Sequence, residues 1–292
     1  PGTVTFPLDI LAALALLLQA ADQPLLVTTG WLTDRLGDRD LVLFHIGARA
    51  GYDAGHIPGA QFLAPTVEWS RPRVEGRLFL ELPDLAVLDS AFEARGISDD
   101  SRIVLYSADR QFTPASRALF TLEYAGLRGR VSILDGGLEA WKADGRPLST
   151  DLPSPRPGRF TPKPDSTLVV DAGFVAANLA SPLVRILDAR DTSFYNGRAT
   201  GQGRDGRIPG AGSYPFSTVI DSSGRFRPLP VLEAQFTGAG VGAGQGVVTY
   251  CHIGQQASLV WFAARLVGLP ARLYDGSFQD WAARKELPIQ RL

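Results

Sequence analysis

The stretch Val247–Ser258, which reads VVTYCHIGQQAS, decides both the fold and the chemistry of this chain. Its first four residues are β-branched or aromatic and predict a buried strand that ends at Tyr250. The single cysteine of the chain, Cys251, follows at once, and a short loop leads into an apolar helical pattern over Ala257–Val267. Because parallel α/β sheets bind ligands at the carboxyl ends of their strands, Cys251 stands where a site is expected.

The loop after Cys251 supplies the electrostatics that a reactive thiol requires. Loop amides and the N-terminus of the following helix create a positive partial charge, which stabilises a thiolate and lowers the pKa of the cysteine. Gly254 permits the tight backbone path that lets amides converge on one sulfur. Cys251 is therefore the candidate nucleophile. The competing interpretation is a buried cysteine that packs as a small hydrophobic residue.

Working outward, the chain repeats itself, which is the pattern of a duplicated domain. The repeated anchors occur in the same order in both halves: Ile103–Tyr106 with Val247–Tyr250, Ile57–Ala60 (IPGA) with Ile208–Ala211, and Leu134–Gly137 (LDGG) with Tyr274–Ser277 (YDGS). A tryptophan, Trp141 or Trp281, follows each Asp-Gly turn at the same spacing and is predicted to fill the core. The Tyr274–Gly276 turn is predicted to shape the rim of the active site.

Strands and helices alternate within each copy. We predict strands at Leu41–Ile46, Ile103–Tyr106, Val131–Leu134, Val184–Leu187, Val247–Tyr250 and Ala271–Tyr274, and helices at Pro114–Tyr124 and Ala257–Val267. The fold class is α/β, with two domains that are each a mainly parallel sheet flanked by helices. A segment with six prolines from Pro147 to Pro164 separates them, so we divide the chain into domains 23–147 and 165–292 and a linker 148–164.

Residues 1–22 contain the apolar run Ile10–Leu18, which has the length of a signal-peptide core and precedes small residues. We interpret it as a remnant of a secretory signal, or alternatively as a first amphipathic helix. The first interpretation predicts a periplasmic or otherwise exported protein, and the second allows a cytoplasmic one. No apolar run reaches the roughly 18–20 residues of a membrane span.

The composition excludes several classes of function. Lys plus Arg is 29 and Asp plus Glu is 30, so no basic excess exists to bind a nucleic acid. One cysteine rules out an intrachain disulfide. With one cysteine and three histidines, the chain has too few of these residues to favour a Cys/His zinc cluster. We expect neither a metal nor a cofactor. The glycine-rich segment 238–244 precedes a strand instead of following one, so it is not a dinucleotide fingerprint.

Both halves resemble rhodanese domains, and the whole chain resembles a tandem-domain sulfurtransferase. The resemblance rests on the anchors above, on Gly55–Ala60 (GHIPGA), on the strand end Leu187–Arg190 (LDAR) and on the loop that opens with Cys251. It implies that Cys251 is catalytic and that Asp188 and Arg190 support the site. It also implies that the substrate is bound by the loop residues His252, Ile253, Gly254, Gln255, Gln256 and Ala257.

The resemblance implies that only the C-terminal copy reacts. The N-terminal copy carries Ser107 at the position of the nucleophile, with no base that the sequence identifies, so we expect it to be inert. The first domain of this family covers one side of the active cleft, and Arg110 or Trp69 is the candidate to contact substrate from there.

The implied mechanism is double displacement through a persulfide on Cys251. The donor is a small anionic sulfur compound, thiosulfate or 3-mercaptopyruvate, and the acceptor is cyanide or a thiol. Loop amides stabilise the charge on sulfur in the way an oxyanion hole does. We expect a monomer or a weak dimer.

Two departures from the family pattern affect the choice of donor. The loop carries no permanent cation, and His252 supplies one only when protonated, so thiosulfate turnover is predicted to rise as the pH falls through its titration near 6.5. The arginine that the family has a few residues after the Asp-Ala-Arg strand end is also absent; Arg198, Arg204 or Arg207 is expected to substitute. Asp188 either hydrogen-bonds the loop or pairs with Arg190.

Three rival functions remain. A related phosphatase would need an arginine where Ala257 stands, so that activity is disfavoured. A persulfide relay or binding module would take sulfur from a protein partner and pass it on without fast turnover. A vestigial cysteine, sealed away from any cleft, would make the duplication purely structural.

Overall fold

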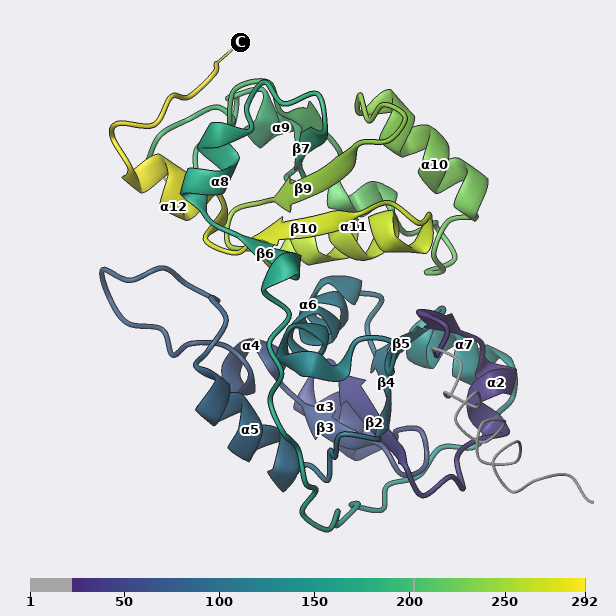
Figure 1. Cartoon of the computed structure of the whole chain (residues 1–292). Coiled ribbons are helices and arrows are strands. Elements are labelled where there is room, and N and C mark those ends of the chain that lie inside the picture. The colour runs from purple at the N-terminus through teal and green to yellow at the C-terminus, as the bar shows by residue number, and fades with distance from the viewer. Residues whose placement is uncertain (1–22, 202, 292) are drawn as a thin grey trace, which may run out of the picture.

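The computed structural model describes residues 23–201 and 203–291, which form two α/β domains stacked on one another (Figure 1). The predicted fold class is confirmed, because each domain contains a five-stranded sheet in which every pairing is parallel. The segment 1–22 lies outside the described residues, so the predicted signal and the predicted location stay predictions.

The N-terminal sheet has the strand order β1-β5-β4-β2-β3. Its strands are β1 (Leu26–Val27), β2 (Leu41–Ile46), β3 (Gln61–Leu63), β4 (Arg102–Ser107) and β5 (Val131–Leu134). Its helices are α2 (Thr29–Thr33), α3 (Arg49–Ala54), α4 (Pro65–Glu68), α5 (Leu85–Ala94), α6 (Phe112–Leu122) and α7 (Gly137–Ala143), and a π-helical turn (Glu123–Leu127) extends α6.

The C-terminal sheet repeats this order as β6-β10-β9-β7-β8. Its strands are β6 (Val169–Val170), β7 (Val184–Asp188), β8 (Gly212–Ser213), β9 (Gly246–Tyr250) and β10 (Ala271–Tyr274). Its helices are α8 (Ala172–Ala177), α9 (Thr192–Tyr195), α10 (Leu229–Gly238), α11 (Gln255–Leu266) and α12 (Ser277–Ala283), with short 3₁₀ turns at Ser166–Leu168 and Phe216–Thr218. Helix α11 begins at Gln255, two residues earlier than predicted.

The duplication extends to single hydrogen bonds. Tyr106 and Tyr250 occupy equivalent places in the central strands, and each hydroxyl accepts the amide of the isoleucine that opens the Ile-Pro-Gly-Ala turn. The two tryptophans predicted to fill the core are fully buried, and each donates its indole N–H to a proline carbonyl, at 2.8 Å in both domains. The repeat is therefore one structural unit used twice.

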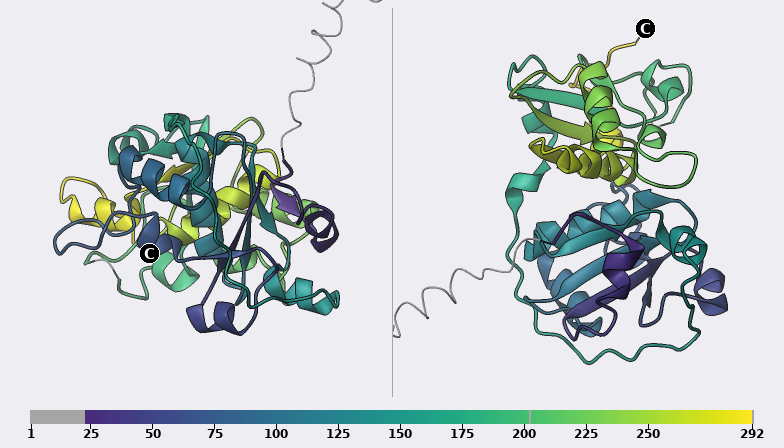
Figure 2. Two further views of the ribbon diagram at one scale, coloured as in Figure 1. Left: turned by 90° about the horizontal axis from the view of Figure 1, so that it is seen from below. Right: turned by 90° about the vertical axis from the view of Figure 1, so that its right-hand side faces the viewer.

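Helices α6 and α11 lie against each other at the junction of the domains (Figures 1 and 2). Phe120 packs edge-on against Trp261, and the Ser116 and Ser258 hydroxyls are 2.9 Å apart. One hydrophobic cluster runs through this contact from the N-terminal sheet to the C-terminal sheet. The helix that follows Cys251 is thus buried against its counterpart in the other domain.

The proline-rich segment 148–164 runs along the N-terminal domain without a helix, and its one strand-like contact is the bridge from Ser149 to His56. Phe160 from this segment packs on Phe92. Trp69, a candidate for the cleft, is instead buried against Phe44 and Phe92, so that expectation is wrong. Its apolar ring is needed in the core, which sequence pattern did not reveal.

Candidate active site

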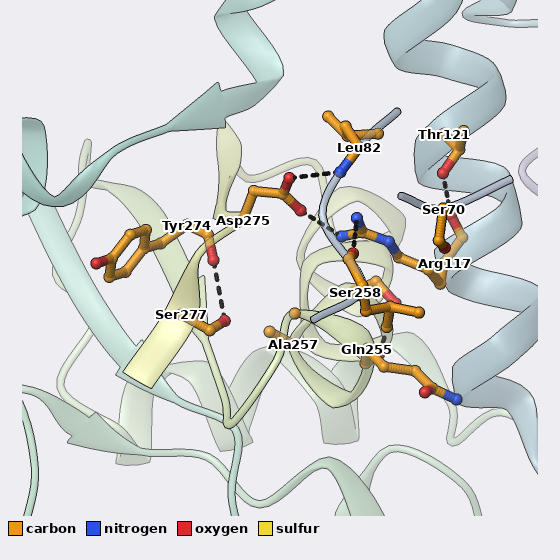
Figure 3. Close-up of polar contacts among 12 residues, drawn as sticks. Ser70, Leu82, Arg117, Thr121, Gln255, Ala257, Ser258, Tyr274, Asp275 and Ser277 are labelled. Carbon is orange, nitrogen blue, oxygen red and sulfur yellow. Dashed lines mark hydrogen bonds and ion pairs between the residues drawn. The ribbon is translucent and has the colours of Figure 1, made fainter. Parts of the chain in front are cut away.

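Cys251 directly follows the central strand β9 and precedes α11 by a short loop. Its backbone amide donates to Ser277 Oγ at 3.2 Å, and its carbonyl accepts the Phe278 amide at 2.9 Å. Ser277 in turn donates to the Tyr274 carbonyl (Figure 3). The turn between β10 and α12 therefore holds the cysteine backbone in place, and the prediction that Cys251 lies at a strand end is met by this geometry.

One backbone amide is aimed at the sulfur. The Gly254 N–H donates to Cys251 Sγ over 3.2 Å, and Gly254 has φ +86°, a left-handed conformation that glycine adopts without strain. The first helical hydrogen bond of α11 runs from the Ser258 amide to the Gly254 carbonyl, so the amides of residues 255–257 belong to the unpaired first turn. Both features favour negative charge on the sulfur.

The cysteine side chain has no exposed surface. A donor therefore cannot reach the sulfur in this conformation. The surroundings of the sulfur are nevertheless not purely apolar, because the Gly254 amide donates a hydrogen bond to it. Since a donor must touch the sulfur, reaction at Cys251 requires a movement that opens the site.

His252 is held neutral by its surroundings. Burial, with a smaller contribution from the nearby Arg190 charge, lowers the pKa of His252 to about 4. Its ring meets Phe194 edge-on, with ring centres 4.4 Å apart, and its Nδ1 is buried without a hydrogen-bond partner among the described residues. The predicted gain in cationic charge near pH 6.5 is therefore wrong, because the ring stays uncharged until far lower pH.

The other loop residues differ in what they can offer. Ile253 is half-buried, Gln255 Nε2 lies 3.4 Å from Thr113 Oγ1 of the other domain, and Gln256 Oε1 is buried without a partner among the described residues. Ala257 accepts the Thr249 hydroxyl on its carbonyl. No side chain of the loop carries a charge at neutral pH.

Asp188 and Arg190 form a buried pair. Arg190 binds both carboxylate oxygens of Asp188, with a shortest distance of 2.6 Å, and also donates to the Gly206 carbonyl. The Tyr250 hydroxyl donates to the same carboxylate at 2.7 Å, and burial raises the pKa of Tyr250 well above its usual value. Of the two interpretations of Asp188, the salt bridge is the one the geometry contains, so the pair supports the strand end next to Cys251.

The three candidate substitute arginines point to other partners. Arg204 donates to the Leu287 carbonyl, Arg207 is buried and donates to the Tyr195 carbonyl, and Arg198 is exposed. None of their contacts within the described residues includes Cys251. Phe194 faces the loop instead, so the expectation of a substitute arginine is not supported by the geometry.

The equivalent site in the N-terminal domain is a closed turn. Ser107 Oγ lies 3.2 Å from Asp109 Oδ1 and donates to the Gln111 carbonyl at 3.1 Å. Asp109 is a carboxylate that the sequence did not single out beside this serine. Arg110 is exposed and reaches the C-terminal domain at Gly224, away from the Cys251 loop.

A contact between the domains was not predicted at all. Arg117 of α6 pairs with Asp275, whose other oxygen accepts the Leu82 amide at 2.8 Å (Figure 3). Leu82 and Arg117 belong to one domain and Asp275 to the other. The only signal in the sequence was the Asp-Gly turn itself, which was expected to shape the rim.

Within the described residues, no cluster of three metal-ligating side chains occurs, and no helix is long and apolar enough to cross a membrane. The geometry above, a thiol at the strand–helix junction of one of two like α/β domains, is the arrangement expected of a cysteine-dependent group-transfer protein.

Comparison with known proteins identifies the family. The rhodanese-like domain family matches twice, over residues 28–144 and 171–284. The chain is 37% identical to the probable 3-mercaptopyruvate sulfurtransferase of Pseudomonas aeruginosa, over 90% of this chain and 97% of that protein. It is 31% identical to the sulfur carrier protein TtuD of Thermus thermophilus, over 93% and 98%. It is 28% identical to the thiosulfate sulfurtransferase of Azotobacter vinelandii, over 92% and 98%.

A solved structure supports the same fold. The wild-type structure of EanB superimposes with a TM-score of 0.80 at 24% identity, covering 93% of this chain and 70% of that one. The chain belongs to the rhodanese-like domain family and is a tandem-domain sulfurtransferase. The predicted family, fold and enzyme class are confirmed.

Proposed function

We propose that Cys251 is the nucleophile of this sulfurtransferase and carries the transferred sulfur as a persulfide. The observation that supports this most directly is the Gly254 amide, 3.2 Å from Sγ, at the start of α11. A backbone donor and a helix N-terminus stabilise the thiolate before the reaction and the persulfide anion after it. Ser107, the equivalent residue of the other domain, donates into its own turn and takes no part.

The reaction proceeds in two displacements. The Cys251 thiolate attacks the sulfur of the donor, forming an S–S bond while the bond from that sulfur to the rest of the donor breaks. With 3-mercaptopyruvate, the electron pair of the broken C–S bond stays on carbon, and the resulting enolate takes a proton to give pyruvate. With thiosulfate, sulfite leaves. Cyanide or a thiolate then attacks the outer sulfur of the persulfide and restores the Cys251 thiolate.

We favour 3-mercaptopyruvate over thiosulfate as the donor. His252 is neutral at pH 7 and the other side chains of the loop are uncharged, so the loop offers no fixed cation to a dianion. A monoanionic donor loses less on entering such a site, because burying an unpaired charge is costly. The 37% identity to a probable 3-mercaptopyruvate sulfurtransferase agrees with this preference.

A second candidate is a persulfide relay, in which sulfur arrives from a protein partner. Two observations favour it: the 31% identity to a sulfur carrier protein, and the complete burial of Cys251, which a partner could relieve by opening the loop. In that case persulfide forms fast only when the partner is present.

Steady-state turnover distinguishes these possibilities. Pyruvate release from 3-mercaptopyruvate and thiocyanate release from thiosulfate are compared with cyanide as the acceptor. We expect kcat/KM to be at least about tenfold higher for 3-mercaptopyruvate, equivalent to about 1.4 kcal/mol. Cys251→Ser abolishes both reactions, and the matched control Ser107→Ala changes neither. Faster turnover of thiosulfate would contradict the donor preference, and no turnover of either donor would favour the relay.

A further inference from the structure

A buried arginine of the N-terminal domain lies against the catalytic loop of the other domain. The Arg117 side chain is 1% exposed, and a fully buried charge is rare unless it is paired. Its Nη1 is 2.7 Å from Asp275 Oδ1, and its Nη2 donates to the Leu80 carbonyl at 2.6 Å. Figure 3 shows the Arg117 guanidinium directed toward the Asp275 carboxylate, with the loop that carries Leu82 beside them.

Arg117 and Asp275 enclose the glycine that addresses the nucleophile. A β-carbon placed on Gly254 would lie 3.1 Å from Arg117 Nη1 and 3.1 Å from the Asp275 carbonyl oxygen. The Gly254 backbone is therefore seated against both partners of the ion pair. Since the amide of the same glycine donates to Cys251 Sγ, a shift of the pair would move the one backbone donor that the described part of the chain places at the sulfur.

The N-terminal domain makes further hydrogen bonds to the turn that holds Asp275 and to the following helix α12. The Gln279 side-chain amide exchanges two hydrogen bonds with the backbone of Phe79, and the Leu82 amide donates to Asp275 Oδ2. Between them Leu80 has φ +64°, a left-handed conformation that a bulky residue keeps only when its surroundings enforce it. These contacts fix the position from which the Leu80 carbonyl holds Arg117.

The competing explanation is that the Arg117–Asp275 pair only stabilises the packing of the two domains. A second interdomain ion pair serves as the control. Arg265 of α11 pairs with the buried Glu123 of the π-helical turn that extends α6, so a second arginine–carboxylate pair joins the two domains at a different place. Arg265 stands in the last turn of α11, whereas Gly254 caps its first. Both pairs hold the domains together, but only the Arg117 pair touches the catalytic loop.

We propose that Arg117 is a positioning residue for sulfur transfer: through its ion pair with Asp275, which lies beside Gly254, the non-catalytic domain sets the backbone donor at Cys251. The proposal rests on the proposed function of Cys251. It predicts that the N-terminal domain contributes to the rate of the chemical step, beyond covering the site.

The test compares Arg117→Met with Arg265→Met in the full chain. Each substitution removes one interdomain arginine and leaves one buried carboxylate unpaired. Because Cys251 is the single cysteine, its alkylation by iodoacetamide reports on the nucleophile alone. We expect Arg117→Met to lower kcat at least about tenfold with the donor KM changed less than about twofold. We also expect its alkylation profile to shift to higher pH.

Arg265→Met is expected to lower the melting temperature while kcat and the alkylation profile stay as in the wild type. The proposal is overturned by a folded Arg117→Met with a wild-type kcat and profile, or by equal losses in the two variants. If Arg117→Met does not fold, Arg117→Lys takes its place in the comparison. Lysine keeps the positive charge but cannot bind Asp275 and the Leu80 carbonyl together, so we expect a folded protein with a lower kcat. Absence of a persulfide in the wild type would contradict the proposed function. The alkylation profiles of the two variants would still show whether Arg117 affects the Cys251 thiol.

Discussion

At the scale of single residues, the account depends on how the backbone at Gly254 presents its amide to Cys251. The positive φ of Gly254 and the closeness of Arg117 and Asp275 both disfavour a side chain at this position. The geometry that stabilises the sulfur is therefore a property of backbone conformation, and the identity of neighbouring side chains matters less.

Gly254→Ala is expected to reduce the rate of persulfide formation at least about tenfold, because the new methyl group displaces the amide from the sulfur. Gly268→Ala is the matched control: Gly268 has φ +77° but nothing within 4 Å of the added β-carbon. Both variants should lose about 1–2 kcal/mol of stability from the left-handed conformation. Rapid-mixing mass spectrometry measures the rate, and equal rates in the two variants would contradict the role of the Gly254 amide.

His252 should not influence turnover in the physiological range. Its pKa of about 4 leaves the ring neutral above about pH 5, so kcat/KM should show no His252-dependent inflection near pH 6.5. His252→Gln should give a pH–rate profile of the same shape between pH 5.5 and 8. An inflection near pH 6.5 that disappears in the variant would show that the ring is charged during turnover.

At the scale of elements, the central strand of each domain carries a tyrosine at or next to its end, and this tyrosine accepts a hydrogen bond from the neighbouring Ile-Pro-Gly-Ala turn. In the C-terminal domain the Tyr250 hydroxyl also donates to Asp188. In the N-terminal domain the Tyr106 hydroxyl lies 3.0 Å from His45 Nδ1. The polar partner differs between the copies while the tyrosine and its amide partner are the same. This placement keeps the loop after each strand at a constant position relative to the sheet.

Tyr106→Phe and Tyr250→Phe should each lower the free energy of unfolding by about 1–3 kcal/mol, because each leaves a buried isoleucine amide without a partner and removes a second buried hydrogen bond. Only Tyr250→Phe should also lower kcat, since only its strand leads into the catalytic loop. Urea denaturation and steady-state assays measure the two effects. A loss of activity in Tyr106→Phe as large as in Tyr250→Phe would argue against this division of labour.

At the scale of the whole molecule, two copies of one fold share a continuous core through α6 and α11. Sequence reasoning recovered the parallel sheets and the duplication because the repeated anchors IPGA, DGG/DGS and the strand-end tyrosines are local patterns. It could not find the Arg117–Asp275 pair, which joins residues far apart in the chain, nor the burial of Trp69. The sequence also led us to expect that His252 gains a charge near pH 6.5. Burial lowers the pKa of this ring, and burial is a tertiary property that sequence pattern does not reveal.

The stability of the whole chain should fall as the pH is lowered from about 6.5 toward 4. Burial lowers the pKa of both His45 and His252 from 6.5 to about 4, so the unfolded state binds more protons than the folded state across that window. Each histidine therefore lowers the unfolding free energy as the pH falls, whereas Glu123, whose pKa burial raises to about 7, acts in the opposite direction; the two histidines should outweigh it. Urea midpoints at pH 7 and pH 5 measure the effect, and His45→Gln should weaken the dependence. Equal midpoints at both pH values would contradict the neutral burial of the two rings.

The most direct test of the central claim is the intact mass of the protein after brief incubation with 3-mercaptopyruvate, followed by peptide mapping. The account predicts a gain of one sulfur atom, located on the peptide that contains Cys251, removed by cyanide and absent in Cys251→Ser. Turnover in the wild type with no sulfur ever found on Cys251, or turnover that survives in Cys251→Ser, would contradict it.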